Sequence, residues 1–334
     1  MPLLSLFLSA CCAWLGGASL TVDAPHVVLV AGDEEYRSEE ALPMLAALLT
    51  ERHGFRCTTL FSLDPQTGTI DPDRQDHLPG LAVLSEADLV VLFTRFRRLP
   101  DEEMAHVVAY VESGRPLIGI RTATHAFAYP EEARSPFAGW SWNAPDGGFG
   151  RRVLGETWVA HHGHHGSEST RGIVPVAARR HPILRGVDDV WGPTDVYAIR
   201  DLPLDATVLL EGSVLAGMEP DAPAVTDGRN TPRMPIAWCR ERSLPTGGKQ
   251  RVVCSTIGAS VDLANEDLRR FFVNASYWCL GREGDIPERN DARLVGPYEP
   301  TMFGFGSYRR GLSPAGVLGA AFGSPAAAEE SESR

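Results

Sequence analysis

The sequence predicts an α/β protein built on a doubly wound parallel sheet. Apolar runs at Val27–Val30, Asp88–Thr94 and Pro116–Arg121 have the composition of strands that are buried on both faces. Segments of helical period separate them, one beginning near Ser38 and one over Pro100–Ser113. Because buried strands alternate with helices of these lengths, we expect parallel strands joined by right-handed crossovers.

The first 20 residues are predicted to be an export signal outside the fold. Residues 1–20 carry no charged side chain, and the apolar run Leu3–Leu15 has the length of a signal-peptide core rather than of a transmembrane span. Small residues at 16–19 offer a cleavage site. We therefore expect an exported protein, periplasmic or extracellular. A lipid anchor at Cys11 is the less favoured alternative, because the preceding segment is short and lacks basic residues.

The cysteines lack the spacing that is typical of zinc ribbons and of thioredoxin-like redox sites. Removal of the leader leaves four cysteines without a CxxC pair, and their pairing stays open between free thiols and a disulfide: Cys57, Cys239, Cys254 and Cys279.

Charge excludes two classes of partner. The net charge is −12, and no run is rich in Lys or Arg, so nucleic acid and anionic membranes are poor partner candidates. A homo-oligomer stays open.

An acidic loop follows the first predicted strand. Ligands of open parallel sheets bind where strands end and helices begin, so this loop is a candidate site wall: Asp33, Glu34, Glu35 and Tyr36. The alternative is that the acids only solvate the loop and favour the helix start. Ser38 is a candidate N-cap, but proline is tolerated only in a first turn, so Pro43 predicts that the regular helix begins later.

The end of the strand Pro116–Arg121 decides between reaction classes. Class I glutamine amidotransferases place a nucleophilic cysteine at a sharp strand-to-helix turn, in a pattern like Gly-x-Cys-x-Gly. Here the turn holds Arg121, which is always protonated and cannot attack a carbonyl, so we expect no glutaminase activity. Arg121 and Thr122 offer hydrogen-bond donors instead. His125 fits a site residue and a helix-start residue equally well.

An aromatic stretch and a histidine cluster follow. Residues 127–150 are rich in Pro, Gly and aromatic residues, which suits an ordered loop over the binding edge; aromatic faces suit sugar rings, although ordinary packing is commoner. The segment Gly155–Gly166 then carries four of the ten histidines: His161, His162, His164 and His165. Imidazole binds metals and transfers protons, so a divalent metal and acid–base chemistry both stay open. Neighbouring residues of an extended segment point in opposite directions, so at most two of the four should face one ligand.

The rest of the chain predicts short strands, one helix and a C-terminal extension. The strands are expected at Ile173–Ala177, Asp195–Ile199, Thr207–Leu210, Pro235–Arg240 and Arg251–Ile257. They extend the sheet or form an attached β layer. Asp262 is a cap or a pocket residue before the helix Leu268–Leu280. Residues 283–314 are expected to pack on the domain, and residues 315–334 to be disordered.

Five segments together resemble ThuA-like proteins, named for trehalose utilisation. In chain order they are VAGDEEYRSEEALPML, GIRTATHAF, GETWVAHHGHHG, HPILRGVDDVWGPTDVYAI and CSTIGASVDLANEDLRRFFVNASYWCLG. The resemblance implies a flavodoxin-like, class I glutamine amidotransferase-like domain over residues 25–282, with an added β-rich second half, no glutaminase nucleophile and an association with carbohydrate breakdown, 3-keto sugars included. One departure is Ala259, where many relatives have histidine.

From the residues and the resemblance together, we expect proton exchange with a sugar or keto-sugar in one pocket. The candidate catalytic residues are Glu35, His125, His161, His162 and Asp195. The candidate substrate-binding residues are Asp33, Glu34, Tyr36, Arg121, Thr122, Trp158 and Tyr197. Arg121 is expected to steady developing negative charge. The alternative, which Ala259 favours, is a non-catalytic carbohydrate-binding protein that kept the pocket.

Overall fold

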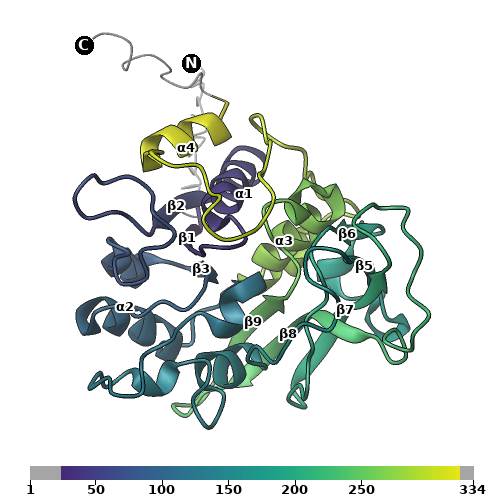
Figure 1. The fold of residues 1–334 in the computed structure, drawn as a ribbon, viewed down its shortest axis with the longest axis horizontal. Helices are drawn as coiled ribbons and strands as arrows, with labels where there is room; N and C mark the ends of the chain where they lie inside the picture. Colours follow the sequence, from purple (N-terminus) through teal and green to yellow (C-terminus); the bar gives the residue numbers. More distant parts are fainter. Residues whose placement is uncertain (1–23, 324–334) are drawn as a thin grey trace, which may run out of the picture.

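A computed structural model describes residues 24–323, so the predicted export signal lies outside the described residues. The described chain forms one mixed sheet of nine strands with helices against it (Figure 1), in the order β2-β1-β3-β4-β9-β8-β7-β5-β6. Five strands are parallel: β2 (Arg56–Phe61), β1 (His26–Gly32), β3 (Leu89–Thr94), β4 (Leu117–Ile120) and β9 (Lys249–Ser255). Four continue the same sheet in antiparallel pairs: β8 (Met234–Ser243), β7 (Ala206–Leu215), β5 (Ser169–Ile173) and β6 (Val190–Gly192).

Helices cover both faces of the sheet. α1 (Ser38–His53) and α3 (Glu266–Cys279) bury their apolar residues in one core, and α2 (Asp101–Glu112) buries its own in a second core on the other face. Along β1, Val27 and Leu29 enter the first core while Val28 enters the second. Burial on both faces explains why this strand is a continuous apolar run in the sequence.

The start of α1 corrects the sequence analysis. The helix begins at Ser38 and includes Pro43. Ser38 is not the cap: its hydroxyl accepts the N–H of Asp33 (3.0 Å), and Arg37, with φ 62°, precedes the helix. Pro43 removes only one helical hydrogen bond, and the burial of eleven of the sixteen residues of this helix outweighs that loss.

Two predicted strands are also corrected. β5 ends at Ile173, because Pro175 lacks a ladder donor, and Val176–Ala178 forms a 3-10 turn. Asp195–Ile199 is no regular strand among the described elements. It makes a short antiparallel contact instead, in which Val196 accepts the N–H of His162 (2.8 Å).

The C-terminal extension packs on α1 and ends in a helix, α4 (Pro314–Ala321). The predicted disorder from residue 315 is therefore wrong for residues 315–321. The hydroxyl of Ser313 caps α4 by accepting the N–H of Gly316 (3.1 Å), and Val317 and Leu318 pack against the core. A short apolar helix that would not persist alone is thus held by tertiary packing.

Two further findings bear on the expectations. Cys57, Cys239, Cys254 and Cys279 are free thiols. Within residues 24–323, no helix combines the length and apolar character that crossing a bilayer requires.

Candidate active site

The carboxyl ends of β1, β3 and β4 meet at one edge of the sheet, where a small cleft opens. Its empty volume is about 250 Å³, and residues from the loops after these three strands and from residues 158–197 line it: Glu35, Arg95, Phe96, His125, Trp158, His161 and Tyr197. Of the predicted set, the structure brings Glu35, His125, Trp158, His161 and Tyr197 to the cleft. Glu35 and His125 reach the cleft because they follow the carboxyl ends of β1 and β4.

Asp195 connects the charged groups behind the cleft. Its Oδ2 lies 2.7 Å from Nδ1 of His161, and its Oδ1 lies 3.2 Å from Nδ1 of His165 and 3.0 Å from a guanidinium nitrogen of Arg121. Burial raises the pKa of this carboxyl, but the hydrogen bonds from His161 and His165 and the charge of Arg121 outweigh burial and hold the pKa well below its usual value. Asp195 is therefore a carboxylate at neutral pH.

This carboxylate fixes the proton on His161. An ionised carboxylate only accepts hydrogen bonds, so Nδ1 of His161 carries the proton of this hydrogen bond, and in the neutral ring Nε2 has the lone pair. The side chain of His161 is 38% exposed and lines the cleft. His161 and Asp195 thus form a base and its orienting group, the arrangement that general-base catalysis requires.

Arg121 supports the site from inside and does not reach the cleft. Its φ of 46° gives the sharp turn after β4 that the sequence predicts. The guanidinium is fully buried between the rings of Tyr36 and Tyr197, with its carbon 4.5 and 3.8 Å from the two ring centroids. It donates to the backbone carbonyl of Asp195 (2.9 Å) and to the Tyr36 hydroxyl (3.2 Å). The hydrogen bonds that Arg121 was predicted to donate to a substrate are therefore made to protein groups instead.

The two tyrosines complete this buried support. Tyr197 donates its hydroxyl to that of Tyr36 (3.2 Å). Burial raises the pKa of both phenols, so both stay protonated. The ring of Tyr197 reaches the cleft, whereas Tyr36 lies behind it.

Most of the acidic loop after β1 is structural. Asp33 accepts the N–H groups of Glu35 (2.8 Å) and Tyr36, and its other oxygen accepts the Thr122 hydroxyl (2.5 Å). Glu34 pairs with Arg95 and Arg97. Asp33, Glu34 and Thr122 therefore do not line the cleft, which corrects their assignment as substrate-binding residues.

Glu35 is the acid that faces the cleft. Its carboxylate lies 3.3 Å from Nε of Arg95 and 3.4 Å from Nε2 of His165. Burial raises its pKa, and the nearby charge of Arg95 offsets only part of that rise.

His125 is a neutral ring in the cleft wall. Burial lowers its pKa well below the usual value, and the charges of Arg95 and Arg121 lower it further. Its Nδ1 lies 3.1 Å from the Thr124 hydroxyl, and its ring packs against Phe96 and Trp158 with centroids 5.1 and 5.7 Å away.

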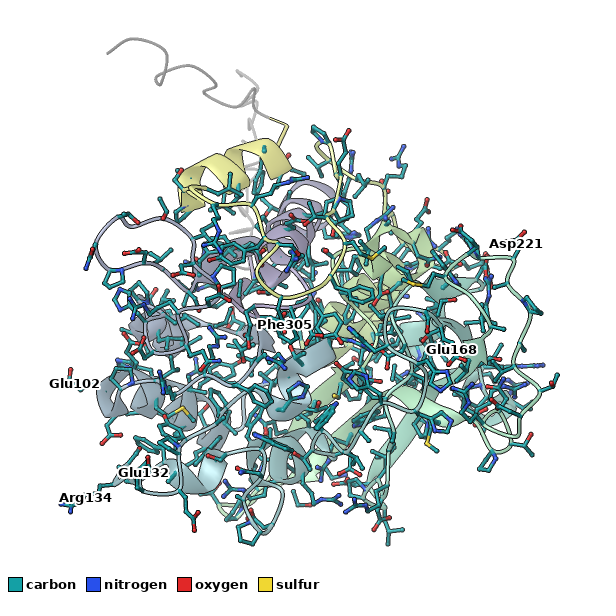
Figure 2. All side chains as sticks on the ribbon, viewed as in Figure 1. Glu102, Glu132, Arg134, Glu168, Asp221 and Phe305 are labelled. Atoms are coloured by element: carbon teal, nitrogen blue, oxygen red, sulfur yellow. The ribbon has the colours of Figure 1, made fainter. Side chains whose placement is uncertain are left out.

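The histidine cluster splits between two faces of its segment. His162 contacts the carbonyl of Arg229 (2.8 Å), and His164 pairs with Glu168 (3.2 Å), so neither reaches the cleft. Figure 2 labels Glu168 well to one side of the drawn face. His161 and His165 contact Asp195 whereas His162 and His164 point to other partners, and the assignment of His162 as a site residue is corrected.

The predicted metal set changes accordingly. The ligand atoms that lie within 4.8 Å of one another belong to His161, His165 and Asp195, without His162 or His164. Both Asp195 oxygens already accept hydrogen bonds, and the buried Arg121 guanidinium lies 3.0 Å from one of them. A divalent ion would meet that fixed positive charge, so the donor set fits proton transfer better than metal binding.

Sequence reasoning missed four residues. Arg95 and Phe96 follow β3 at the same edge, so the strand-end rule could have found them. The sequence places His165 in the histidine cluster but not among the candidate catalytic residues. Asp262, fully buried, accepts the N–H and hydroxyl of Thr194 (3.1 and 2.7 Å) and the N–H of Ala259 (2.9 Å). It thereby holds the residue before Asp195, and it is neither a helix cap nor a cleft residue; Asn265 caps α3.

The fold and the cleft define a class: an α/β protein whose strand ends carry an imidazole oriented by a buried carboxylate, with a buried arginine at the sharp turn after β4. A family model described as ThuA, trehalose utilisation, matches residues 27–279. The chain belongs to the ThuA family.

Solved ThuA-like structures resemble the chain at low identity. One from Parabacteroides merdae shares 14% identity and covers 78% of this chain and 91% of its own, with a TM-score of 0.49. Another, from Bacteroides uniformis, shares 15% identity and covers 79% and 95%, with a TM-score of 0.48. No curated protein matches the chain.

Proposed function

We propose that the cleft carries out acid–base chemistry on a carbohydrate, with His161 as the base. The observation that carries this proposal is the hydrogen bond from Nδ1 of His161 to the buried carboxylate of Asp195, which leaves Nε2 free at the cleft. Aromatic faces of Phe96 and Trp158 line the same space and suit a sugar ring. The family description, trehalose utilisation, supports a carbohydrate as the substrate class.

In the proposed reaction, Nε2 of His161 takes a proton from a sugar hydroxyl or from the carbon next to a keto group. The electrons of the broken C–H bond move to the keto oxygen, and the imidazolium that forms is stabilised by Asp195. Arg95 replaces Arg121 as the group that steadies the developing oxyanion, because Arg95 reaches the cleft. When the keto group re-forms, these electrons make a C=C bond to the next ring carbon and the bond from that carbon to the glycosidic oxygen breaks; Glu35, whose pKa is raised, gives the departing oxygen its proton.

Two neighbouring histidines provide the test. We expect His161→Gln to lower turnover of a keto-disaccharide by about 10²–10⁴-fold, the usual contribution of a general base. His162→Gln is the matched control, because its side chain contacts the Arg229 carbonyl away from the cleft, and it should keep wild-type turnover. Turnover by both variants at the wild-type rate would remove His161 as the base. Binding of the sugar without turnover by any form would identify a non-catalytic carbohydrate-binding protein.

We also propose export and a relation to glutamine amidotransferases. The uncharged apolar leader supports export, and N-terminal sequencing of the mature protein should begin after the region of Ala18. An intact Met1 in a cytoplasmic fraction would contradict export. The order β2-β1-β3-β4-β9 and the left-handed φ of Arg121 support a flavodoxin-like, class I glutamine amidotransferase-like core.

A further inference from the structure

Residues 301–308, the cover segment, lie beyond the family-matched residues 27–279 and pack against residues of the active site. The N–H of Gly304 donates to the carbonyl of Glu35 (2.8 Å). The ring of Phe303 lies 5.0 Å from that of His165 and 5.5 Å from that of Tyr36. The cover segment therefore contacts both the acidic loop and the histidine segment of the site.

A buried arginine fixes the cover segment in place. Arg37, fully buried, donates to the Gly304 carbonyl (2.7 Å), the Ser307 hydroxyl (2.5 Å) and the Thr301 hydroxyl (3.2 Å). Glu40 of α1 accepts the N–H of Thr301 (2.7 Å). Several charge-assisted hydrogen bonds make this loop a rigid wall rather than a loose end.

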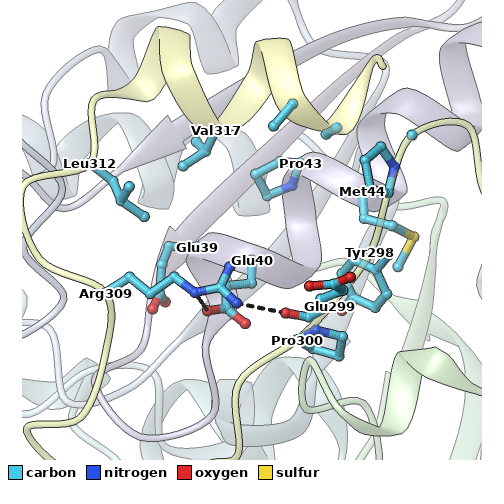
Figure 3. Close-up of a pocket in the computed structure, with 14 residues that line it drawn as sticks. Glu39, Glu40, Pro43, Met44, Tyr298, Glu299, Pro300, Arg309, Leu312 and Val317 are labelled. Carbon is cyan, nitrogen blue, oxygen red and sulfur yellow. Dashed lines mark hydrogen bonds and ion pairs between the residues drawn. The ribbon is translucent and has the colours of Figure 1, made fainter. Parts of the chain in front are cut away.

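The extension is also held on α1 further along. Figure 3 shows Arg309 beside Glu40, with the two charged groups 3.8 Å apart, and donating to the carbonyl of Glu299 (2.8 Å). Glu40, at the start of α1, thus binds Thr301 at one end of the cover segment and Arg309 just after the other end.

Phe305 stands out in this wall because its ring is exposed. Its exposed fraction is 62%, although a phenylalanine gains free energy from burial. The guanidinium of Arg95 lies 4.9 Å from the Phe305 centroid and 4.3 Å from that of Phe96, which lines the cleft. Figure 2 places Phe305 near the middle of the drawn face. The ring therefore extends the aromatic lining from the cleft to the surface.

The size of the cleft limits what fits inside. Its empty volume of about 250 Å³ includes space that is open to solvent, so the enclosed part of the cleft is smaller than one sugar ring. A sugar can therefore enter the cleft only in part, and the rest of a glycoside must lie over the surface beside it.

We propose that Phe305 binds the second sugar ring of a disaccharide or longer glycoside whose first ring lies at the mouth of the cleft. An apolar ring face stacks on the C–H face of a pyranose, and Arg95 holds the aromatic ring in position. The cover segment thus gives this chain a preference for glycosides over monosaccharides. This inference rests on the proposed function only in that the cleft binds a sugar.

Calorimetry with two probes, trehalose and methyl α-glucoside, tests the subsite. We expect Phe305→Ala to weaken trehalose binding about tenfold, which corresponds to the loss of one aromatic stacking contact, and to leave methyl α-glucoside binding unchanged. Phe305→Trp should keep trehalose affinity. Met302→Ala, half exposed in the same segment, is the matched control and should change neither affinity.

The outcomes separate this inference from the function on which it rests. Equal weakening for both sugars, or no weakening for trehalose, would overturn the Phe305 subsite alone. A loss in Met302→Ala as large as that in Phe305→Ala would assign the effect to the loop rather than to the ring, and would overturn the subsite too. Failure of the wild-type protein to bind either sugar would overturn the proposed function together with this inference.

Discussion

Asp195→Asn is expected to lower turnover by about 10³–10⁴-fold, comparable to the loss of the orienting carboxylate in a serine-protease triad. Asparagine cannot match the carboxylate as an acceptor of the Nδ1 proton, so His161 loses the tautomer that leaves Nε2 free for the substrate. It also removes the negative charge that stabilises the imidazolium formed in the reaction. Steady-state turnover of a keto-disaccharide measures this loss.

The same substitution is expected to destabilise the fold. Asp195 is the buried partner of the Arg121 guanidinium, and removal of one partner of a buried ion pair costs about 3–5 kcal/mol. His161→Gln keeps that pair and therefore separates loss of chemistry from loss of fold. If Asp195→Asn is folded by circular dichroism and turns over like the wild type, the proposed role of Asp195 is wrong.

The depressed pKa of Asp195 sets the sign of a pH effect. Its stabilising contribution is present above the carboxyl's unfolded pKa and is lost as the pH falls through the lower, folded pKa. The free energy of unfolding of the wild type should therefore fall on acidification, and Asp195→Asn should lack this part of the fall.

Glu39→Gln is expected to stabilise the protein at pH 8. Glu39 is buried at the start of α1, and neither carboxylate oxygen has a hydrogen-bond partner among the described residues. Burial raises its pKa to about 8, and the neighbouring Glu40 and Asp33 add to the rise while Arg37 opposes it. Figure 3 shows Glu39 beneath the extension. The unfolded chain, with an ordinary pKa, releases this proton at a much lower pH.

The sign follows from proton binding. Between the unfolded and folded pKa values, the folded chain holds one proton more, so the free energy of unfolding falls as the pH rises, by up to about 1.4 kcal/mol per pH unit. Glutamine never ionises. Urea unfolding should therefore show Glu39→Gln more stable than wild type by about 4 kcal/mol at pH 8, with a much smaller difference at pH 5.

Glu51→Gln is the matched control for this prediction. Glu51 lies on the same helix but is exposed, so its removal should change stability by less than about 0.5 kcal/mol at either pH. A Glu39→Gln variant whose stability relative to wild type is the same at pH 5 and pH 8 would show that Glu39 is ionised in the folded protein.

The parallel half of the fold could be predicted because local signals there agree with tertiary structure. The runs at 56–61, 88–94 and 116–121 are strands within one residue of their predicted ends. Prediction failed where tertiary contacts decide. Pro43 is accommodated in a buried helix, and α4 is stable because it packs on α1.

Part of the site could also be predicted, because local sequence signals there agree with the tertiary structure. Strand ends locate Glu35 and His125, and the family resemblance locates Asp195. The choice between His161 and His162 depends on the side-chain direction of one short segment, which only its contact with residue 196 fixes. The sequence predicts that residues 283–314 pack on the domain, but no motif links Phe305 to Arg95, so the contact of the cover segment with the site could not be predicted.

Deuterium exchange shows directly whether His161 moves a proton of a bound sugar. Purified protein is mixed with 3-ketotrehalose in D₂O, and the hydrogens on the carbons beside the keto group are followed by NMR. We expect wild type and His162→Gln to speed deuterium uptake at one of these carbons or to convert the sugar, and His161→Gln to do neither. Binding of the keto-sugar by wild type with no deuterium uptake and no conversion would show that His161 moves no proton of the sugar.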